Sequence, residues 1–274
     1  MDDIRTALAV IDGWGAEHAA AAIVGPAGII ATGGEPDRRY SWASVTKLVT
    51  ALAVLDAVED GHIDLDEPAG PPGSAVRHLL AHASGLPFEG EEVLASPGAR
   101  RIYSNPGFDA LGALLAARDG APFEEAVRTR VMLPLGMAAT DLDGRPSEGL
   151  HGPVGDLAAL ARELLRPTIV SRATLDMATT TAFPGLIGVL PGVGRFDPLD
   201  WGLGFEIRAA KVPHWTGTRN SQASFGHFGG SGTFLWVDPT IDIALVCLTD
   251  RAYGPWALEA WPSFSDAVIA ALAG

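Results

Sequence analysis

Ser44-Val45-Thr46-Lys47 is the stretch of this 274-residue chain that says most about its fold and chemistry. Lys47 is one of only two lysines, against seventeen arginines. On a helix, residues three positions apart share a face, so the Ser44 hydroxyl and the Lys47 amine can meet. Arginine keeps its proton, whereas burial can drive a lysine towards the neutral amine, which is a base. The pattern therefore predicts a nucleophilic serine with a lysine partner.

The residues after this stretch predict a helix over 43–59. Leu48, Leu52, Leu55 and Val58 recur at helical spacing and form an apolar stripe, and Gly61 ends the helix. Ser44 then falls in the first turn, where free backbone N–H groups and the helix dipole favour negative charge. We expect this position to stabilise an oxyanion that develops beside Ser44.

Composition limits the class of protein. Hydrophobic residues make up 47% of the chain and charged residues 19%, which is typical of a compact globular protein. The net charge of −14 argues against nucleic acid and anionic membranes as partners. The segment 1–5 begins with acidic residues, unlike a secretory signal, and predicts a cytoplasmic protein. Cys247 lies in an apolar β-like run and is expected to be plain core.

The order of the predicted elements indicates an α/β (α+β) fold. Residues 19–32 read as a hairpin of two short strands, and the end of the chain returns to strands before a closing helix over 256–273. Further predictions are a helix over 3–14, middle helices over 75–82, 107–118, 122–132, 154–165 and 171–178, and late strands over 204–207, 224–228, 232–237 and 241–248. We therefore expect an antiparallel sheet built from both termini and flanked by helices, with 1–60 and 203–274 as the sheet domain. A mostly helical insertion over 61–202 would form the second lobe, with the site between the two.

Two more short segments accompany Ser44-Val45-Thr46-Lys47, in chain order: Tyr103-Ser104-Asn105 and His227-Phe228-Gly229-Gly230. Two flanking stretches, 79–87 (LLAHASGLP) and 202–205 (GLGF), add to the pattern. Together they resemble the serine β-lactamase and penicillin-binding-protein superfamily. The resemblance is to its class C β-lactamase-like branch, with D-alanyl-D-alanine carboxypeptidases and family VIII esterases, and it covers roughly residues 20–250. It implies a β-lactamase-like fold.

The resemblance implies a role for each motif residue. Ser44 would attack a carbonyl and become acylated. Either Lys47 or Tyr103 would be the general base, and Tyr103 would also protonate the leaving group. Asn105 would orient Lys47 and bind the carbonyl region of the substrate. The substrate-binding set is completed by His227, Phe228, Gly229 and Gly230, with the N–H groups of Ser44 and Gly230 as the oxyanion hole.

Phe228 departs from the pattern of the branch. Threonine or serine is frequent at this position, where the hydroxyl helps to hold a substrate carboxylate. A neutral histidine beside a phenylalanine is a poor carboxylate receptor. The leading hypothesis is therefore an esterase that forms an acyl-Ser44 intermediate on small neutral esters.

Other readings stay open. A β-lactamase or D-alanyl-D-alanine carboxypeptidase of the same mechanism is the second hypothesis, and a catalytically silent binding protein on this scaffold is the third. Ser44 could also be a simple helix-start residue, and His227 a satisfied edge-strand histidine. We expect a small-molecule ester or amide as the only partner and no cofactor. We also expect no metal, since His62, His78, His151 and His214 lack ligand spacing. The oligomeric state is left open.

Overall fold

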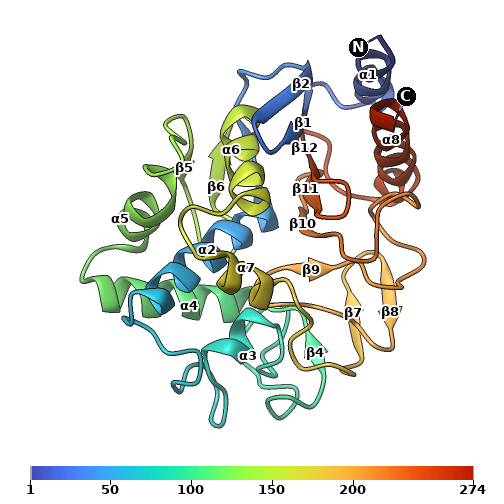
Figure 1. Ribbon diagram of the computed structural model, residues 1–274. Coiled ribbons are helices and arrows are strands. Elements are labelled where there is room, and N and C mark those ends of the chain that lie inside the picture. The colour runs from blue at the N-terminus through green and yellow to red at the C-terminus, as the bar shows by residue number, and fades with distance from the viewer. Residues whose placement is uncertain (1, 274) are drawn as a thin grey trace.

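The computed structural model describes residues 2–273, and a six-stranded antiparallel sheet lies at its centre (Figure 1). The strand order is β2-β1-β12-β11-β10-β9. The bounds are β1 Ala19–Gly25, β2 Gly28–Gly34, β9 Glu206–Ile207, β10 Phe225–Gly229, β11 Thr233–Asp238 and β12 Ile243–Thr249. The first strand pairs directly with the last, with Ala19 opposite Thr249. The predicted sheet built from both termini is confirmed.

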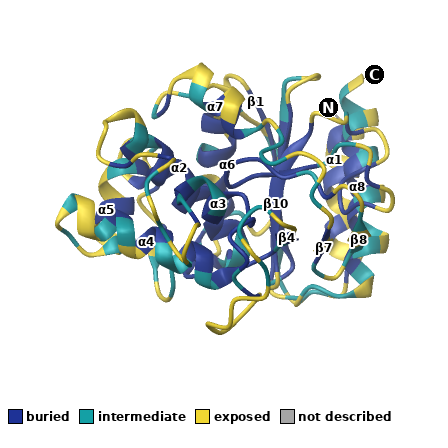
Figure 2. Cartoon of the chain, turned by 90° about the horizontal axis from the view of Figure 1, so that it is seen from below, coloured by how far each residue is buried: buried dark blue, intermediate teal, exposed yellow. Residues whose placement is uncertain are grey.

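Helices cover both faces of this sheet (Figure 2). On one face lie α1 (Asp2–Leu8) and the long α8 (Pro255–Ala273), which pack against each other. On the other face, α6 (Val154–Leu165) packs against β1 and β12. Alternate residues of β1 therefore enter two separate cores, and the strand reads as a continuous apolar run because both of its faces are buried.

The predicted catalytic helix begins as a 3-10 turn over Ala43–Val45 and continues as α2 (Thr46–Glu59). Leu48, Leu52 and Leu55 are buried, whereas Val58 is partly exposed. The rest of α2 is also buried almost all round, so it is a central helix and not one with a single apolar stripe. The other helices of the middle region lie at or near their predicted positions: α3 Val76–Leu80, α4 Asn105–Asp119, α5 Phe123–Val127 with a π-helical turn over Arg128–Met132, and α7 Arg172–Ala178.

The structure also contains two small three-stranded sheets that the sequence did not predict. They are β3-β6-β5 and β4-β7-β8, with bounds β3 Tyr40–Ser41, β4 Arg101–Ile102, β5 Asp141–Leu142, β6 Leu150–Gly152, β7 Gly188–Leu190 and β8 Gly194–Phe196. All of these strands except β3 belong to the middle region. Strands of two or three residues are too short to show an alternating pattern. They matter for the site because β3 leads into the turn before α2 and β4 ends next to Tyr103.

The division into a sheet domain over 1–60 and 203–274 and an inserted lobe over 61–202 remains a proposal. Within the second segment, α6 packs on the sheet, while α2 from the first segment packs on α4. One helix from each of the two segments therefore packs against the other proposed lobe. Within residues 2–273, no helix is long and apolar enough to cross a membrane.

Candidate active site

Ser44 and Lys47 face each other at the start of α2. The Lys47 Nζ donates a hydrogen bond to the Ser44 Oγ at 3.2 Å and a second one to the Ser147 carbonyl oxygen at 2.9 Å. Lys47 is fully buried, whereas Ser44 is partly exposed. Ala43, immediately before the serine, has a φ of +43°, a left-handed conformation that side chains rarely adopt and that is enriched at active sites. The predicted pairing of hydroxyl and amine is present in the structure.

The loop 146–150 is tied to α2 by two further hydrogen bonds. The Thr50 Oγ1 donates to the Pro146 carbonyl at 2.7 Å, and the Leu150 N–H donates to the Thr46 Oγ1 at 3.0 Å. These bonds satisfy the buried hydroxyls of the helix and hold the Ser147 carbonyl against the amine. Lys47 is therefore oriented by Ser147 and not, as the resemblance implied, by Asn105.

Burial lowers the pKa of Lys47 from 10.5 to about 7, because a charged amine in this position loses its hydration. The carboxylates of Glu148 and Asp109 oppose the shift, and Arg145 adds to it. The hydrogen-bond partners of the amine are a hydroxyl and a carbonyl, and neither carries a compensating charge. A substantial fraction of Lys47 is thus a neutral amine near pH 7, as the task of a general base requires.

Tyr103 follows β4 and lies at the same site. Its ring packs against His82, with 4.5 Å between centroids, and against the edge of Trp201. The Lys47 Nζ lies 4.8 Å from the centroid of the tyrosine ring. Burial raises the pKa of the Tyr103 hydroxyl well above its ordinary value, and the nearby Ser44 hydroxyl opposes this only in part. Of the two candidate bases, Lys47 is therefore the easier one to deprotonate in the free protein.

His227 links the third motif to Tyr103. Its Nδ1 lies 2.6 Å from the Phe228 carbonyl oxygen, which can only accept, so Nδ1 carries the proton. Burial lowers the pKa of His227 to about 3, and the ring is neutral. Its Nε2, 3.3 Å from the Tyr103 hydroxyl, is then an acceptor for the tyrosine O–H. His227 is satisfied by hydrogen bonds and also belongs to the site.

Asn105 is buried at the start of α4, and its amide faces a different partner from the one expected. The Nδ2 donates to the Glu89 Oε1 at 2.7 Å. A carboxylate can only accept, so this contact fixes the orientation of the amide. Arg145, hydrogen-bonded to the same glutamate, is the main cause of the lowered pKa of Glu89, and Asn105 adds to it. Asn105 thus joins the site to a group of charges at its rim.

The turn after β10 is fastened to the residues that precede Ser44. The Ser231 Oγ donates to the Ser41 carbonyl at 2.8 Å, and the Thr233 Oγ1 donates to the Trp42 carbonyl at 3.1 Å. A Cβ at Gly229 would lie 2.6 Å from the Trp42 carbonyl oxygen, so only glycine permits this approach.

The same contacts bring the backbone of Gly230 close to that of Ser44. Among the hydrogen bonds of residues 2–273, neither N–H group has an acceptor. Both residues line one cavity. Two free donors beside a nucleophile are what an oxyanion hole needs.

The cavity that contains Ser44 has a volume of about 320 Å³. Of the predicted residues, six line it: Ser44, Tyr103, Asn105, His227, Phe228 and Gly230. Lys47 and Gly229 lie behind this surface. Phe228 contributes an apolar wall, and its ring packs against Tyr253 with 4.9 Å between centroids.

Several residues of the site carry no recognisable sequence signal. Glu89, Glu148 and Tyr253 line the cavity, and Ser147 holds Lys47 through its backbone carbonyl. They come from loops whose positions depend on the tertiary fold, and a backbone contact leaves no constraint on residue type. No motif in the sequence could have identified them.

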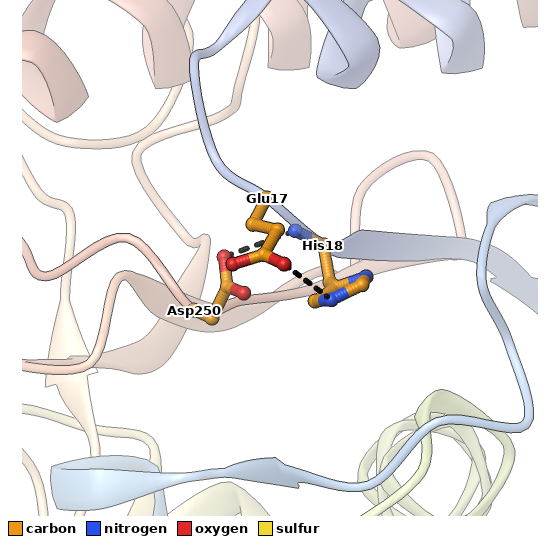
Figure 3. Close-up of side chains that lie close together, drawn as sticks. All are labelled: Glu17, His18 and Asp250. Atoms are coloured by element: carbon orange, nitrogen blue, oxygen red, sulfur yellow. Dashed lines mark hydrogen bonds and ion pairs between the residues drawn. The ribbon is translucent and has the colours of Figure 1, made fainter.

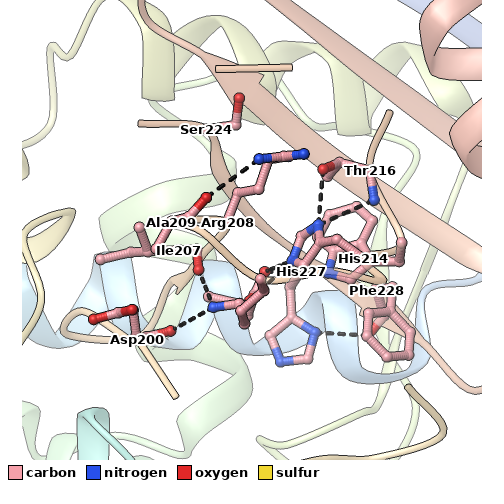
Figure 4. Close-up of polar contacts among 12 residues, drawn as sticks. Asp200, Ile207, Arg208, Ala209, His214, Thr216, Ser224, His227 and Phe228 are labelled. Carbon is pink, nitrogen blue, oxygen red and sulfur yellow. Dashed lines mark hydrogen bonds and ion pairs between the residues drawn. The ribbon is translucent and has the colours of Figure 1, made fainter. Parts of the chain in front are cut away.

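The second lysine of the chain has a different environment, and its Nζ donates to the backbone carbonyls of Asp200 and Ile207, two residues labelled in Figure 4. The Lys211 Nζ forms a buried ion pair with Glu206 at 2.6 Å, and His214 and Trp215 donate to the same carboxylate. These partners overcome the cost of burial and hold the pKa of Glu206 at about 2. Lys211 is thus paired with a carboxylate, whereas Lys47 has no ion pair among the described residues.

One cluster has side chains of the kind that bind metals. Glu17, His18 and Asp250 place three potential ligand atoms within 4.8 Å of one another, where β1 begins and β12 ends (Figure 3). The His18 Nδ1 lies 2.6 Å from Glu35, so the imidazole already has a partner. None of these residues lines the Ser44 cavity, and the expectation of no metal stays an expectation.

Comparison with known proteins agrees with the geometry. A family model described as Beta-lactamase matches residues 12–265. A crystal structure of a β-lactamase from Mycobacterium bovis is 54% identical, with a TM-score of 0.95, and the match covers 96% of this chain and 98% of that one.

Curated relatives are more distant. A β-lactamase of Escherichia coli (strain K12) is 23% identical over 78% of this chain and 76% of its own length. Esterase EstB of Burkholderia gladioli is 25% identical over 85% of this chain and 83% of its own. The match to the D-alanyl-D-alanine-carboxypeptidase/endopeptidase AmpH of E. coli covers only 37% of that protein. The chain belongs to the β-lactamase family, whose members related to it are serine hydrolases.

Proposed function

We propose that the protein hydrolyses small esters through a covalent acyl-Ser44 intermediate and that the group next to the reacting carbonyl is neutral. The observation that carries this proposal is the chemistry of the Ser44 cavity. Within the described residues, no lysine or arginine lines it, whereas the carboxylates of Glu89 and Glu148 do. β-Lactams and D-alanyl-D-alanine peptides carry a carboxylate, for which this lining offers no cation and only two carboxylates that Arg145 already pairs.

The proposed reaction begins with attack of the Ser44 Oγ on the ester carbonyl carbon, while the neutral Lys47 amine takes the hydroxyl proton. The N–H groups of Ser44 and Gly230 stabilise the oxyanion. When the C–O bond breaks, the Tyr103 hydroxyl gives its proton to the leaving oxygen and recovers one from the Lys47 ammonium. Water then attacks the acyl-serine, and the carboxylic acid leaves.

A β-lactamase is the second candidate, and a specific observation favours it. The Mycobacterium bovis relative, 54% identical, is described as a β-lactamase. We rank this activity below ester hydrolysis because Phe228 supplies no hydroxyl for a carboxylate and no lysine or arginine of the described residues lines the cavity. A silent binding protein ranks last, since a buried unpaired lysine is costly to keep without a chemical use.

One panel tests the proposal. Native protein and Ser44→Ala are assayed with p-nitrophenyl acetate and butyrate, a chromogenic cephalosporin and a D-alanyl-D-alanine peptide. We expect turnover of the esters by native protein only. Turnover of the cephalosporin at a higher kcat/KM than the esters would favour the second candidate. No turnover of any substrate, with no covalent adduct, would contradict the enzyme proposal.

A further inference from the structure

A second and larger cavity, of about 820 Å³, adjoins the one that contains Ser44. The two cavities share Phe88, Tyr103 and Pro191 as walls. A volume of this size is typical of ligand pockets, whereas 320 Å³ around Ser44 is at the small end of that range. A molecule whose carbonyl reaches Ser44 can therefore extend past Phe88 and Tyr103 into the second cavity.

The walls of the second cavity are apolar and open to solvent. Phe88 is 50% exposed, Leu94 48% and Val189 56%, and all three line it. Ile187, from the chain just before β7, adds to the same surface. Large apolar side chains gathered and exposed at one place indicate a binding surface, in contrast to single exposed ones.

The charge of this cavity is opposite to that of the Ser44 cavity. Arg100 and Arg195 line it, and within residues 2–273 no aspartate or glutamate does. Arg100 donates to the Leu94 carbonyl oxygen, and neither arginine forms an ion pair with a described carboxylate. The third arginine of the lining, Arg101, is buried and bonded to backbone carbonyls, so it is not available to a ligand.

Arg195 is well placed to meet the end of a chain that crosses this surface. It belongs to β8 and is paired across the ladder with Val189 of β7. A guanidinium is a strong receptor for a carboxylate or phosphate, and Arg100 adds a second positive charge to the same lining. The cavity thus offers an apolar surface that ends in an anion receptor.

We propose that the second cavity holds the distal part of the substrate, an apolar chain that ends in an anionic group such as a carboxylate. This inference rests on the proposed ester hydrolysis and extends it, because it gives the substrate class of the same site. The neutral group belongs next to the reacting carbonyl, near Glu89 and Glu148, and the anion belongs at the far end, near Arg100 and Arg195.

The test compares esters that differ only in the distal group. The acyl arm uses the mono-p-nitrophenyl esters of adipic, suberic and sebacic acids against p-nitrophenyl hexanoate, octanoate and decanoate. The alcohol arm uses acetate esters of ω-hydroxyalkanoic acids against n-alkyl acetates of matched length. We expect a carboxylate-ended ester in one arm to exceed its plain partner about fivefold in kcat/KM, the size of a partly exposed ion pair.

The arginines are tested by substitution. In Arg195→Gln and Arg100→Gln, the preference for the carboxylate-ended ester should fall towards unity, and in native protein it should weaken as salt is added. Arg219→Gln is the matched control, because Arg219 is exposed and forms no ion pair with the described residues. It should keep the preference. A preference absent in both arms, or unchanged in both arginine variants, would overturn the inference.

A binding measurement separates this inference from the proposed hydrolysis. Calorimetry with Ser44→Ala protein compares monomethyl suberate with methyl octanoate, and repeats the comparison in Ser44→Ala/Arg195→Gln. Tighter binding of monomethyl suberate that is lost with Arg195 supports the inference even where no ester is turned over. Turnover of plain esters with no gain from the distal carboxylate would contradict this inference alone.

Discussion

Replacement of Lys47 by methionine should abolish activity and stabilise the protein. The amine is fully buried without an ion pair among the described residues, and burial lowers its pKa from 10.5 to about 7. Methionine has a similar length and needs no hydration. The native residue is therefore kept at a cost in stability that only its chemical use explains.

The size of the effect follows from the pKa difference. A shift from 10.5 to about 7 corresponds to about 4–5 kcal/mol of lost stability below pH 7. The substitution also removes the hydrogen bond to Ser147, and the methionine packs imperfectly. Together these losses reduce the gain in stability by about 2 kcal/mol. We expect Lys47→Met to be more stable than native protein by about 2–3 kcal/mol at pH 7.

The sign of the pH dependence can be worked out for this group. Between pH 7 and pH 10.5, the unfolded chain holds the Lys47 proton and the folded chain does not, so the stability of native protein rises with pH in this window. Methionine does not titrate. The advantage of Lys47→Met should thus be greatest below pH 7 and should shrink by about 2 kcal/mol by pH 9.

Urea unfolding at pH 6, 7 and 9, followed by tryptophan fluorescence, measures these differences. Lys211→Met is the matched control, because it removes the only other lysine. It leaves Glu206 buried without its ion-pair partner and should destabilise the protein by about 3 kcal/mol. A Lys47→Met protein that is less stable than native, or whose advantage does not change with pH, would refute the reasoning.

Three other substitutions test separate parts of the site. Glu148→Gln removes a carboxylate that raises the pKa of Lys47, so the rise of kcat/KM with pH should move to lower pH; an unchanged pH profile would count against Lys47 as the base. Lys47→Arg keeps the charge but cannot release the proton, and should lower kcat by at least about a hundredfold. Gly229→Ala would place a Cβ 2.6 Å from the Trp42 carbonyl oxygen and should reduce kcat with little change in KM. Gly230→Ala is the control for stability, because a Cβ at Gly230 would meet no atom within 4 Å. Gly229→Ala should unfold at a lower urea concentration than Gly230→Ala, and equal unfolding midpoints would refute the packing argument.

The principal elements could be predicted from the sequence because each has a strong local signal. The helix over 43–59 has apolar residues at helical spacing, and the strands over 232–237 and 241–248 contain the apolar runs 234–237 and 243–248 on either side of a turn. The β-lactamase-like fold rested on five short motifs in the right order, and the family match over residues 12–265 confirms it. The short strands β3 to β8 could not be predicted, since two or three residues show no periodicity.

Only those site residues that belong to recognisable short sequence motifs could be predicted. Ser44, Lys47, Tyr103 and His227 were predicted to share one site, and the structure places their side chains close together, while their roles stay predictions. The partner of Lys47 was wrong, because a backbone carbonyl at Ser147 takes the role assigned to Asn105 and any residue type can supply one. The arginines of the second cavity were missed for a similar reason: Arg100 and Arg195 are distant in sequence, and only the tertiary fold around the β4-β7-β8 sheet makes them line one cavity.

The most direct test of the central claim is intact-mass spectrometry of the protein after rapid mixing with p-nitrophenyl butyrate or a fluorophosphonate. We expect one covalent adduct per chain on native protein, located by peptide mapping to Ser44, and none on Ser44→Ala. Lys47→Met should acylate far more slowly than native protein. An adduct on a different residue, or turnover of esters by Ser44→Ala at the native rate, would contradict the claim that Ser44 is the nucleophile.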